Sequence, residues 1–351
     1  MKKKVIMVNS QDRDNRLRNE RLNEGINEQV KAKWPDLVGR SFSGIITRGV
    51  GGNYHIGLAD GRSLIAVPRG IFRKTGYTPT VGDRVICSLT NDPDVPARID
   101  DIKPRTTYLV RPPLANTDIL ILTFAVQNPV PDMTLIDKLL IICGLAGINT
   151  VLCFTKQDLN PSAAAQAVTA FRMLGYESFA TSLTDHTELD SFLGENWNGS
   201  IIAFAGPSGT GKSTLFNHIA GETIMPTGEI SEKLGRGRHT TRHVELIPCR
   251  NGYLTDTPGF TSLELPDLGL EPETVIAGYP EFATLAPHCR FNTCRHLKEP
   301  GCAVREAVKN GFIGDTSQQN FVADRYERYT FFRKQLDEID PHIRKKRREL
   351  L

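Results

Sequence analysis

The fold of this chain is decided by residues 206–213, Gly206-Pro207-Ser208-Gly209-Thr210-Gly211-Lys212-Ser213, which fit the pattern G-x-x-x-x-G-K-[ST] in full. The apolar run Ile201 to Ala205 comes before this stretch and predicts a buried strand, and Thr214 to Ala220 predicts the opening of a helix. Glycines let the loop between them close around a phosphate, with its N–H groups turned toward the oxygens. The stretch therefore predicts a nucleoside triphosphate site, in which Lys212 reaches the β- and γ-phosphates and the Ser213 hydroxyl ligates Mg²⁺.

Composition limits the class of protein. The chain has 351 residues, of which 39% are hydrophobic and 24% charged, and this predicts a globular protein of two or three domains. The longest apolar runs, such as Ile119 to Leu122, are far too short to span a membrane, and the charged start Met1 to Met7 has no apolar segment behind it. We therefore expect a cytoplasmic protein without a membrane partner.

A second loop predicts which base the site takes. The run Thr150 to Phe154 predicts a strand that ends in Thr155-Lys156-Gln157-Asp158, close to the Asn-Lys-x-Asp signature of GTP-binding proteins. The Asp158 carboxylate can accept both the N1–H and the 2-amino group of guanine, a donor pair that adenine lacks. Lys156 can lay its stem along the base, and Thr155 stands where the signature has Asn.

Two further segments resemble parts of a GTPase. Thr181-Ser182 is a degenerate version of the loop whose N–H groups contact the guanine oxygen. The polar residues 222–238 lead into His239-Thr240-Thr241, and a threonine at the end of such a switch I loop closes on Mg²⁺ and the γ-phosphate while GTP is bound. Thr240 is the first candidate for this role and Thr241 the second.

A predicted hairpin follows, with strands at Val244 to Cys249 and Tyr253 to Thr255 and with Asn251-Gly252 as its turn. It leads into Asp256-Thr257-Pro258-Gly259, in which Asp256 would hold the Mg²⁺ shell and the Gly259 N–H would sense the γ-phosphate. The predicted magnesium ligands are Ser213, Thr240 and Asp256, and the predicted GTP-binding residues are Thr155, Lys156, Gln157, Asp158, Gly206, Pro207, Ser208, Gly209, Thr210, Gly211, Lys212, Ser213, Thr214, Asp256 and Gly259.

The predicted hydrolytic machinery lacks one common part. Ras-type enzymes place a glutamine just after Asp-x-x-Gly to orient the attacking water, and this chain has Phe260 there. We expect slow hydrolysis by the protein alone, with Lys212 and Thr240 among the catalytic groups. His239 is the nearest candidate for positioning the water, although a solvated loop histidine is the alternative interpretation.

The order of these pieces predicts the topology. Asp118 to Ala125 predicts a buried parallel strand, Leu135 to Ala146 and Pro161 to Leu174 predict helices, and the base-recognition loop precedes the P-loop. An ordinary GTPase has these loops in the opposite order. We therefore predict an α/β P-loop GTPase domain that is circularly permuted, in residues 112–280.

The residues before this domain differ from it in composition and in their predicted secondary structure. Residues 1–35 are polar with mixed charges and predict a flexible arm or a lone frayed helix. Residues 36–111 contain short β-type runs with Asp60-Gly61 as a hairpin turn, which predicts an OB-fold barrel. Between residues 40 and 111, eleven Arg and Lys stand against six Asp, an excess of five where the whole chain has three. This excess favours RNA binding over a barrel with an ordinary solvated surface.

The last segment, 281–351, predicts a metal-binding domain with a helical basic tail. Cys289, Cys294, His296 and Cys302 supply three thiolates and an imidazole, which fill a tetrahedral set without an open position and so predict one structural zinc ion. His288 could substitute for a ligand, but His296 has the better spacing. The predicted helix Phe321 to Ile339 is followed by the basic run Arg344 to Arg348, interpreted as a solvated tail or as another RNA contact.

Taken together, these motifs resemble the bacterial small ribosomal subunit biogenesis GTPases, the RsgA or YjeQ family. The resemblance covers almost the whole chain from about residue 36 and includes Gly237 to Thr241 and the run Cys289-Arg290-Phe291 to Cys302. It implies a cytoplasmic GTPase that binds the small (30S) ribosomal subunit through 16S rRNA during late maturation, with GTPase activity stimulated by the subunit. We expect a monomer that cycles between GTP and GDP.

Two other functions are compatible with parts of the pattern. One is a P-loop kinase or ATPase, which would have no use for Asp158. The other is a non-catalytic RNA-binding scaffold that keeps a nucleotide, which multiple turnovers in the presence of 30S subunits would exclude.

Overall fold

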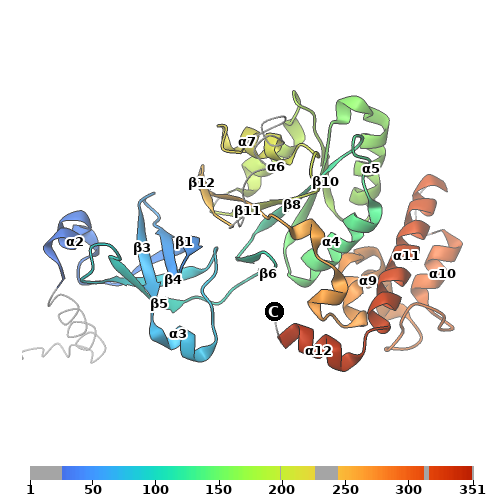
Figure 1. Cartoon of the computed structure of the whole chain (residues 1–351). Coiled ribbons are helices and arrows are strands. Elements are labelled where there is room, and N and C mark those ends of the chain that lie inside the picture. The colour runs from blue at the N-terminus through green and yellow to red at the C-terminus, as the bar shows by residue number, and fades with distance from the viewer. Residues whose placement is uncertain (1–25, 198, 226–243, 312–315, 350–351) are drawn as a thin grey trace, which may run out of the picture. The chain divides into compact units, whose positions relative to one another are not determined.

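The computed structural model describes residues 26–197, 199–225, 244–311 and 316–349 (Figure 1). The chain divides into two compact units, residues 1–105 with 114–116, and residues 106–113 with 117–351. The second unit therefore contains the stretch predicted as the zinc-binding domain and, apart from residues 114–116, the one predicted as the GTPase domain. The segment between the units includes two short strands, β6 (Tyr108–Val110) and β7 (Pro113–Ala115).

The first unit is built on a closed barrel of five strands, as the sequence predicts for an OB-fold. Neighbouring strands are antiparallel except β3 and β5, which are parallel. A short helix, α3 (Gly70–Thr75), lies between the third and fourth strands in the chain. In the order of the barrel, the strands are β1 (Phe42–Val50), β2 (Asn53–Gly57), β3 (Ser63–Pro68), β5 (Ala97–Ile102) and β4 (Arg84–Leu89).

Local chemistry explains how this barrel closes. At Gly44 in β1, an added Cβ would lie 2.3 Å from Cγ2 of Ile56 in β2, so only glycine allows the two strands to approach this closely. The predicted β2–β3 hairpin is confirmed: Gly61 has φ +84°, and the Asp60 carboxylate accepts the Arg62 backbone N–H at 3.0 Å.

A short helix, α2 (Glu28–Lys33), and a 3₁₀ turn, η1 (Pro35–Leu37), precede the barrel. Val30 and Trp34 are buried here, so this part of the stretch predicted as a flexible arm packs against the protein instead. The physical reason is that these two apolar side chains can be covered by residues distant in the sequence, which a local count of polar residues does not register. The remainder of that predicted arm, residues 1–25, lies outside the described residues.

The second unit is built on a six-stranded sheet in which all pairings are parallel except that of the edge strand β12. This confirms the predicted α/β domain, with the strands that carry the base-recognition loops preceding the P-loop strand in the chain. The strands, in sheet order, are β10 (Glu177–Ala180), β9 (Asn149–Thr155), β8 (Ile119–Ala125), β11 (Ile201–Ala205), β13 (Gly252–Asp256) and β12 (Ile247–Cys249).

Helices cover both faces of this sheet (Figure 1). On one face, alternate strand residues such as Ile121 and Phe204 join a core with α6 (Thr187–Asn196) and α7 (Lys212–Ala220). On the other face, Phe154 stacks on Phe171 with 5.8 Å between ring centroids. Strands buried on both faces read as continuous apolar runs, which is how β8, β9 and β11 appear in the sequence. The helices of the second face are α4 (Met133–Leu145) and α5 (Pro161–Met173).

The β12–β13 hairpin forms, but its turn is shifted by one residue from the prediction and its first strand begins at Ile247 instead of Val244. Cys249 pairs with Gly252, so the turn is Arg250-Asn251, with Arg250 at φ +49°, and Gly252 belongs to the strand. An added Cβ at Gly252 would lie 2.3 Å from the Ser200 carbonyl oxygen. This glycine is therefore required by close packing next to the P-loop strand, which the Asn-Gly pattern does not reveal.

The C-terminal part is a set of short helices around α11, and it stands beside the sheet domain (Figure 1). The Arg325 guanidinium of α11 is fully buried and bonds Asp137 of α4, Glu281 of α9 and the Gly278 carbonyl. The elements are η3 (Phe260–Ser262), η4 (Leu265–Leu268), η5 (Pro272–Gly278), α9 (Pro280–Leu285), η6 (Ala286–His288), α10 (Ala303–Asn310), α11 (Thr316–Asp337) and α12 (Pro341–Glu349).

The basic run Arg344 to Arg348 forms most of α12, and only part of it faces solvent: Lys345, Lys346 and Arg348 are exposed, whereas Arg344 is buried. Arg344 is buried and bonds Glu271 at 3.1 Å, and Arg348 bonds the same carboxylate. Arg347 donates to the Pro266 carbonyl of η4 at 2.7 Å. These arginines neutralise acidic groups of their own chain, a possibility that the run of like charges in the sequence does not suggest.

Candidate nucleotide site and metal centre

The P-loop lies where the sequence predicts it, between β11 and α7. At Gly206 an added Cβ would lie 2.2 Å from the Thr123 carbonyl oxygen of the neighbouring strand, so this position must be glycine. Gly211 has φ +83° and caps the helix, which begins at Lys212. The first N–H groups of α7 and the positive end of its dipole therefore face the loop, an arrangement suited to a phosphate.

Lys212 and Asp256 meet at the carboxyl edge of the sheet. Asp256 ends β13 opposite Phe204 of the P-loop strand, and the Lys212 ammonium lies 2.8 Å from its carboxylate. Both side chains are about one-fifth exposed. The structure thus brings together the lysine predicted for the phosphates and the carboxylate predicted for Mg²⁺.

The base-recognition loop follows β9 at the same edge. The Thr155 hydroxyl donates to the Thr210 carbonyl of the P-loop and lies 3.3 Å from the Phe124 carbonyl. Thr155 is buried and Asp158 is exposed, so the first can fasten the loop while the second is open to a ligand. Thr155, the departure from the Asn-Lys-x-Asp signature, therefore makes the contact that joins the two loops.

Neighbouring loops hold Lys156 and Gln157 in place. Lys156 has φ +57° and donates to the Asn128 carbonyl. The Gln157 backbone N–H donates to the Thr181 carbonyl at 3.0 Å, at the start of the 3₁₀ turn η2 (Gln157–Leu159). The structure thus places Thr181-Ser182 beside the base-recognition loop. Asn128, after β8, is a member that the sequence reasoning missed, because its part in the site is a backbone carbonyl.

The segment after Asp256 turns sharply. The Thr257 hydroxyl and backbone N–H both donate to the Phe204 carbonyl, at 2.7 and 3.0 Å, and Gly259 has φ +77°. Phe260 is buried, so it packs inward and offers nothing to a water molecule. Thr257 was also missed, since a threonine between Asp and Pro carries no distinctive signal. The switch I candidates His239, Thr240 and Thr241 lie outside the described residues.

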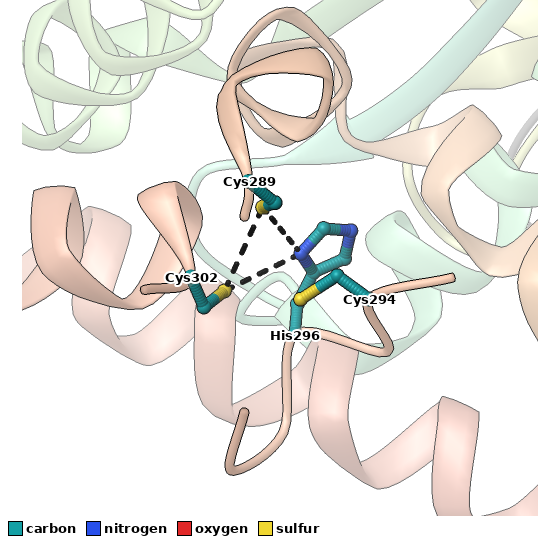
Figure 2. A group of neighbouring side chains, drawn as sticks. All are labelled: Cys289, Cys294, His296 and Cys302. Atoms are coloured by element: carbon teal, nitrogen blue, oxygen red, sulfur yellow. Dashed lines mark hydrogen bonds between the residues drawn. The ribbon is translucent and has the colours of Figure 1, made fainter. Parts of the chain in front are cut away.

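Four side chains meet in the C-terminal part, and one ligand atom of each lies within 4.8 Å of the others (Figure 2). The His296 Nδ1 lies 3.5 Å from Cys289 Sγ and 3.4 Å from Cys302 Sγ, and these two sulfurs are 3.9 Å apart. A tetrahedron with zinc–sulfur bonds of about 2.3 Å has edges of about 3.8 Å. Cys289, Cys294, His296 and Cys302 thus have a donor set and spacing that fit one tetrahedral ion.

Burial acts in opposite directions on two of these ligands. It lowers the pKa of His296, which favours the neutral imidazole that a metal needs, and it raises the pKa of the Cys302 thiol to about 12, so that Cys302 has to release a proton when a metal binds. The exposed His288 is not one of the four. The Tyr326 hydroxyl of α11 donates to the His296 carbonyl at 2.5 Å and fixes this ligand, whose φ is +58°.

Glu299 organises the loop between His296 and Cys302. Its carboxylate accepts backbone N–H groups of Arg295, Leu297 and Lys298 at 3.0 to 3.2 Å. Partial burial would raise the pKa of Glu299, but the backbone hydrogen bonds outweigh it and lower the pKa to about 2. The sequence reasoning missed Glu299 because it is not itself a ligand.

Family models match two parts of the chain. Residues 43–94 match the RsgA N-terminal domain and residues 102–266 match the RsgA GTPase. A small ribosomal subunit biogenesis GTPase RsgA of Ruminiclostridium cellulolyticum is 39% identical over 305 residues, which cover 86% of this chain and 96% of that protein. The chain belongs to the RsgA GTPase family. A second RsgA, from Clostridium novyi, is 40% identical over 300 residues, covering 85% and 97% of the two chains.

Solved structures agree with membership in the RsgA family. The crystal structure of YloQ, described as a circularly permuted GTPase, has 32% identity and a TM-score of 0.69 and covers 86% of this chain and 97% of YloQ. YjeQ from Thermotoga maritima has 30% identity and a TM-score of 0.68 and covers 86% and 100%. Permutation, deduced here from the order of the motifs, is thus shared with a solved relative. Within the described ranges of this RsgA-family chain, every helix is too short or too polar to cross a bilayer.

Proposed function

We propose that this protein hydrolyses GTP and binds the small (30S) ribosomal subunit through 16S rRNA, assisting late maturation of the subunit, which in turn stimulates hydrolysis. The relatives named small ribosomal subunit biogenesis GTPase RsgA support this proposal. We further propose that the protein acts as a monomer in the cytoplasm.

One observation carries the nucleotide part of the proposal. Three loops, which begin at Thr155, Gly206 and Asp256 after strands β9, β11 and β13, meet at one edge of one sheet. Hydrogen bonds join the P-loop and the start of α7 to the other two loops, from Thr155 to Thr210 and from Lys212 to Asp256. A phosphate group held by the P-loop would lie against Lys212, while the guanine would face the Asp158 carboxylate. Ser213 and Asp256 would hold Mg²⁺, which would neutralise charge that develops on the transferred phosphoryl group.

The remaining proposed groups complete this site. Lys212 would offset charge on the β- and γ-phosphates, and Thr240 would close on the magnesium ion when GTP is bound. Because Phe260 is buried and cannot hold water, we propose that His239 positions the attacking water once the ribosomal subunit orders its loop.

The C-terminal cluster would hold one zinc ion in a structural role. Three thiolates and an imidazole saturate a tetrahedral ion and leave it no position for a substrate. Ligand bonds to zinc would offset the desolvation of the buried Cys302 thiol and of the half-buried Cys289 and Cys294, and would thereby fold the loop that Glu299 organises.

The decisive experiment measures multiple-turnover hydrolysis of GTP and of ATP, with no addition, with 30S subunits and with 50S subunits. We expect slow GTP hydrolysis alone, a large increase with 30S subunits only, and little ATP hydrolysis. Equal use of ATP would point to a P-loop ATPase. Tight GTP binding without turnover in the presence of 30S subunits would indicate a non-catalytic scaffold.

A further inference from the structure

The exposed side of the metal-binding loop suggests a specific RNA contact. We infer that an unpaired RNA base stacks on Phe291, and that the adjoining phosphates lie against Arg290 and Lys298. This inference rests on the proposed binding of the small subunit and names one surface that would make it, together with the chemistry of the contact.

Phe291 is an aromatic residue with its ring largely open to solvent, so it is not a core residue. Phe291 is 43% exposed, in the turn between the first two cluster cysteines. Its carbonyl accepts the Cys294 N–H at 3.1 Å, so the turn that carries the ring is fastened to a cluster residue. Base stacking on such a ring accepts any base, because every base has a π-face.

Arg290 is held beside this ring. Its guanidinium carbon lies 5.5 Å from the Phe291 ring centroid, and its backbone N–H donates to the Gly301 carbonyl at 2.9 Å. An added Cβ at Gly301 would lie 3.0 Å from the Arg290 Cβ, so the arginine stem passes across this glycine. A cation that lies over the ring supplies charge for a phosphate next to a stacked base, since a nucleotide has a base and a phosphate one sugar apart.

Arg295 in this loop pairs with Asp337, but the other basic side chains at this surface have no acidic partner among the described residues. Arg290, Lys298 and Arg305 are exposed, and within the described part of the chain none of them has a carboxylate within 4.0 Å. The acid nearest in sequence, Glu299, is occupied by backbone N–H groups. A phosphate backbone can therefore approach without displacing an internal partner.

The three arginines of α12 differ from Arg290 and Lys298, because carboxylates of the protein already pair with them. Arg344 and Arg348 share Glu271, and Arg347 lies 3.7 Å from Asp267, so an RNA phosphate would have to compete with these carboxylates. Arg290 and Lys298 are thus more available to an RNA phosphate than these three arginines of α12. The cluster and the Glu299 hydrogen bonds also hold it rigid, which lowers the entropy lost on binding.

The test measures affinity of the full-length protein for 30S subunits, with a non-hydrolysable GTP analogue bound. Phe291→Ala should weaken binding about fivefold or more, and Phe291→Trp should restore it, because stacking is a property of the ring. Phe331→Ala is the matched control, since Phe331 is an aromatic of similar exposure, 53%, on α11. Zinc content and GTP affinity of each variant verify that the protein has folded.

Charge is tested separately by salt dependence. Arg290→Gln and Lys298→Gln should each reduce the slope of log affinity against log salt by about one, whereas Lys334→Gln on α11 should leave it unchanged. Equal affinities and slopes for all variants would overturn the inference. If the wild-type protein itself failed to bind 30S subunits, the proposed function would fall instead.

The class of partner is decided by cross-linking. A photoreactive benzoylphenylalanine at position 291, in the complex with 30S subunits, should attach to 16S rRNA. Attachment to ribosomal protein alone, or no attachment, would overturn the assignment to RNA.

Discussion

The hydroxyl of Thr155 donates to the backbone carbonyl of Thr210, and this hydrogen bond joins the base-recognition loop to the P-loop across 55 residues of sequence. Both residues are buried, so the bond is shielded from water. The position at which the chain departs from the guanine signature is therefore a structural tie between the two ends of the predicted nucleotide site.

Replacing this hydroxyl should weaken nucleotide binding in general. Thr155→Val leaves the Thr210 carbonyl without its partner and frees the two loops from each other, which costs about 1–3 kcal/mol. We expect GTP and GDP affinities to fall about tenfold together, as measured with a fluorescent nucleotide. Thr155→Asn should restore them. Thr150→Val serves as a control, because the Thr150 hydroxyl bonds Ile148 near the start of the same strand; an equal effect there would contradict the proposed tie.

Base selectivity should depend on Asp158. Asp158→Asn removes one acceptor for the guanine donor pair and adds an amide donor, which suits the 2-oxo group of xanthine. We expect weaker GTP binding with xanthosine triphosphate relatively spared, measured by competition against one labelled nucleotide. Unchanged preference for GTP would remove Asp158 from the base site.

The Cys289, Cys294, His296 and Cys302 cluster should bind one zinc ion per chain, detectable by elemental analysis of purified protein. Chelation should unfold the C-terminal part first, because metal binding supplies folding free energy to a loop with little core of its own. Cys294→Ser should lose the metal, whereas Cys249→Ser, outside the cluster, should keep it. Stoichiometric zinc in the Cys294 variant would argue against this ligand set.

Arg325 should be a large contributor to stability. Arg325→Leu would leave the buried carboxylates of Asp137 and Glu281 without their main cation, and removing one partner of a buried pair costs about 3–5 kcal/mol. Denaturant unfolding should show this loss in the free energy of unfolding of the second unit. Arg348→Ala is the control: its ion pair with Glu271 is about half exposed, and such pairs contribute up to about 1 kcal/mol. Similar losses for both variants would be inconsistent with this difference in burial.

Replacing His239 should lower the rate of GTP hydrolysis without lowering the affinity for GTP. His239→Ala is expected to bind GTP normally and to lose most of the 30S-stimulated rate, while the slow basal rate changes less. Steady-state hydrolysis with and without 30S subunits gives both values. Full stimulation of the variant would assign the water-positioning role to a group on the ribosome.

Contiguous motifs let the sequence determine a large part of this protein. The P-loop, Thr155 to Asp158 and Asp256 to Gly259 each need only a few neighbouring residues, and their order along the chain already specifies the permuted topology. The barrel and the metal cluster could also be predicted from the sequence, since alternation along a strand and ligand spacing are local properties.

Only the tertiary structure decided what the charged and bridging side chains do. Arg325 contacts Asp137, which lies 188 residues away, and the Arg344 to Arg348 run binds Glu271 and η4, although in the sequence it has the appearance of a solvated tail. In the sequence Thr155 is a departure from the guanine signature, whereas in the structure its hydroxyl donates to the Thr210 carbonyl. In the sequence Gly252 is predicted as a turn residue, whereas in the structure the Ser200 carbonyl oxygen leaves no room for a side chain there. A local pattern records which chemistry a residue can offer, whereas its partner is set by how distant segments pack, and that packing brings groups together from across the chain.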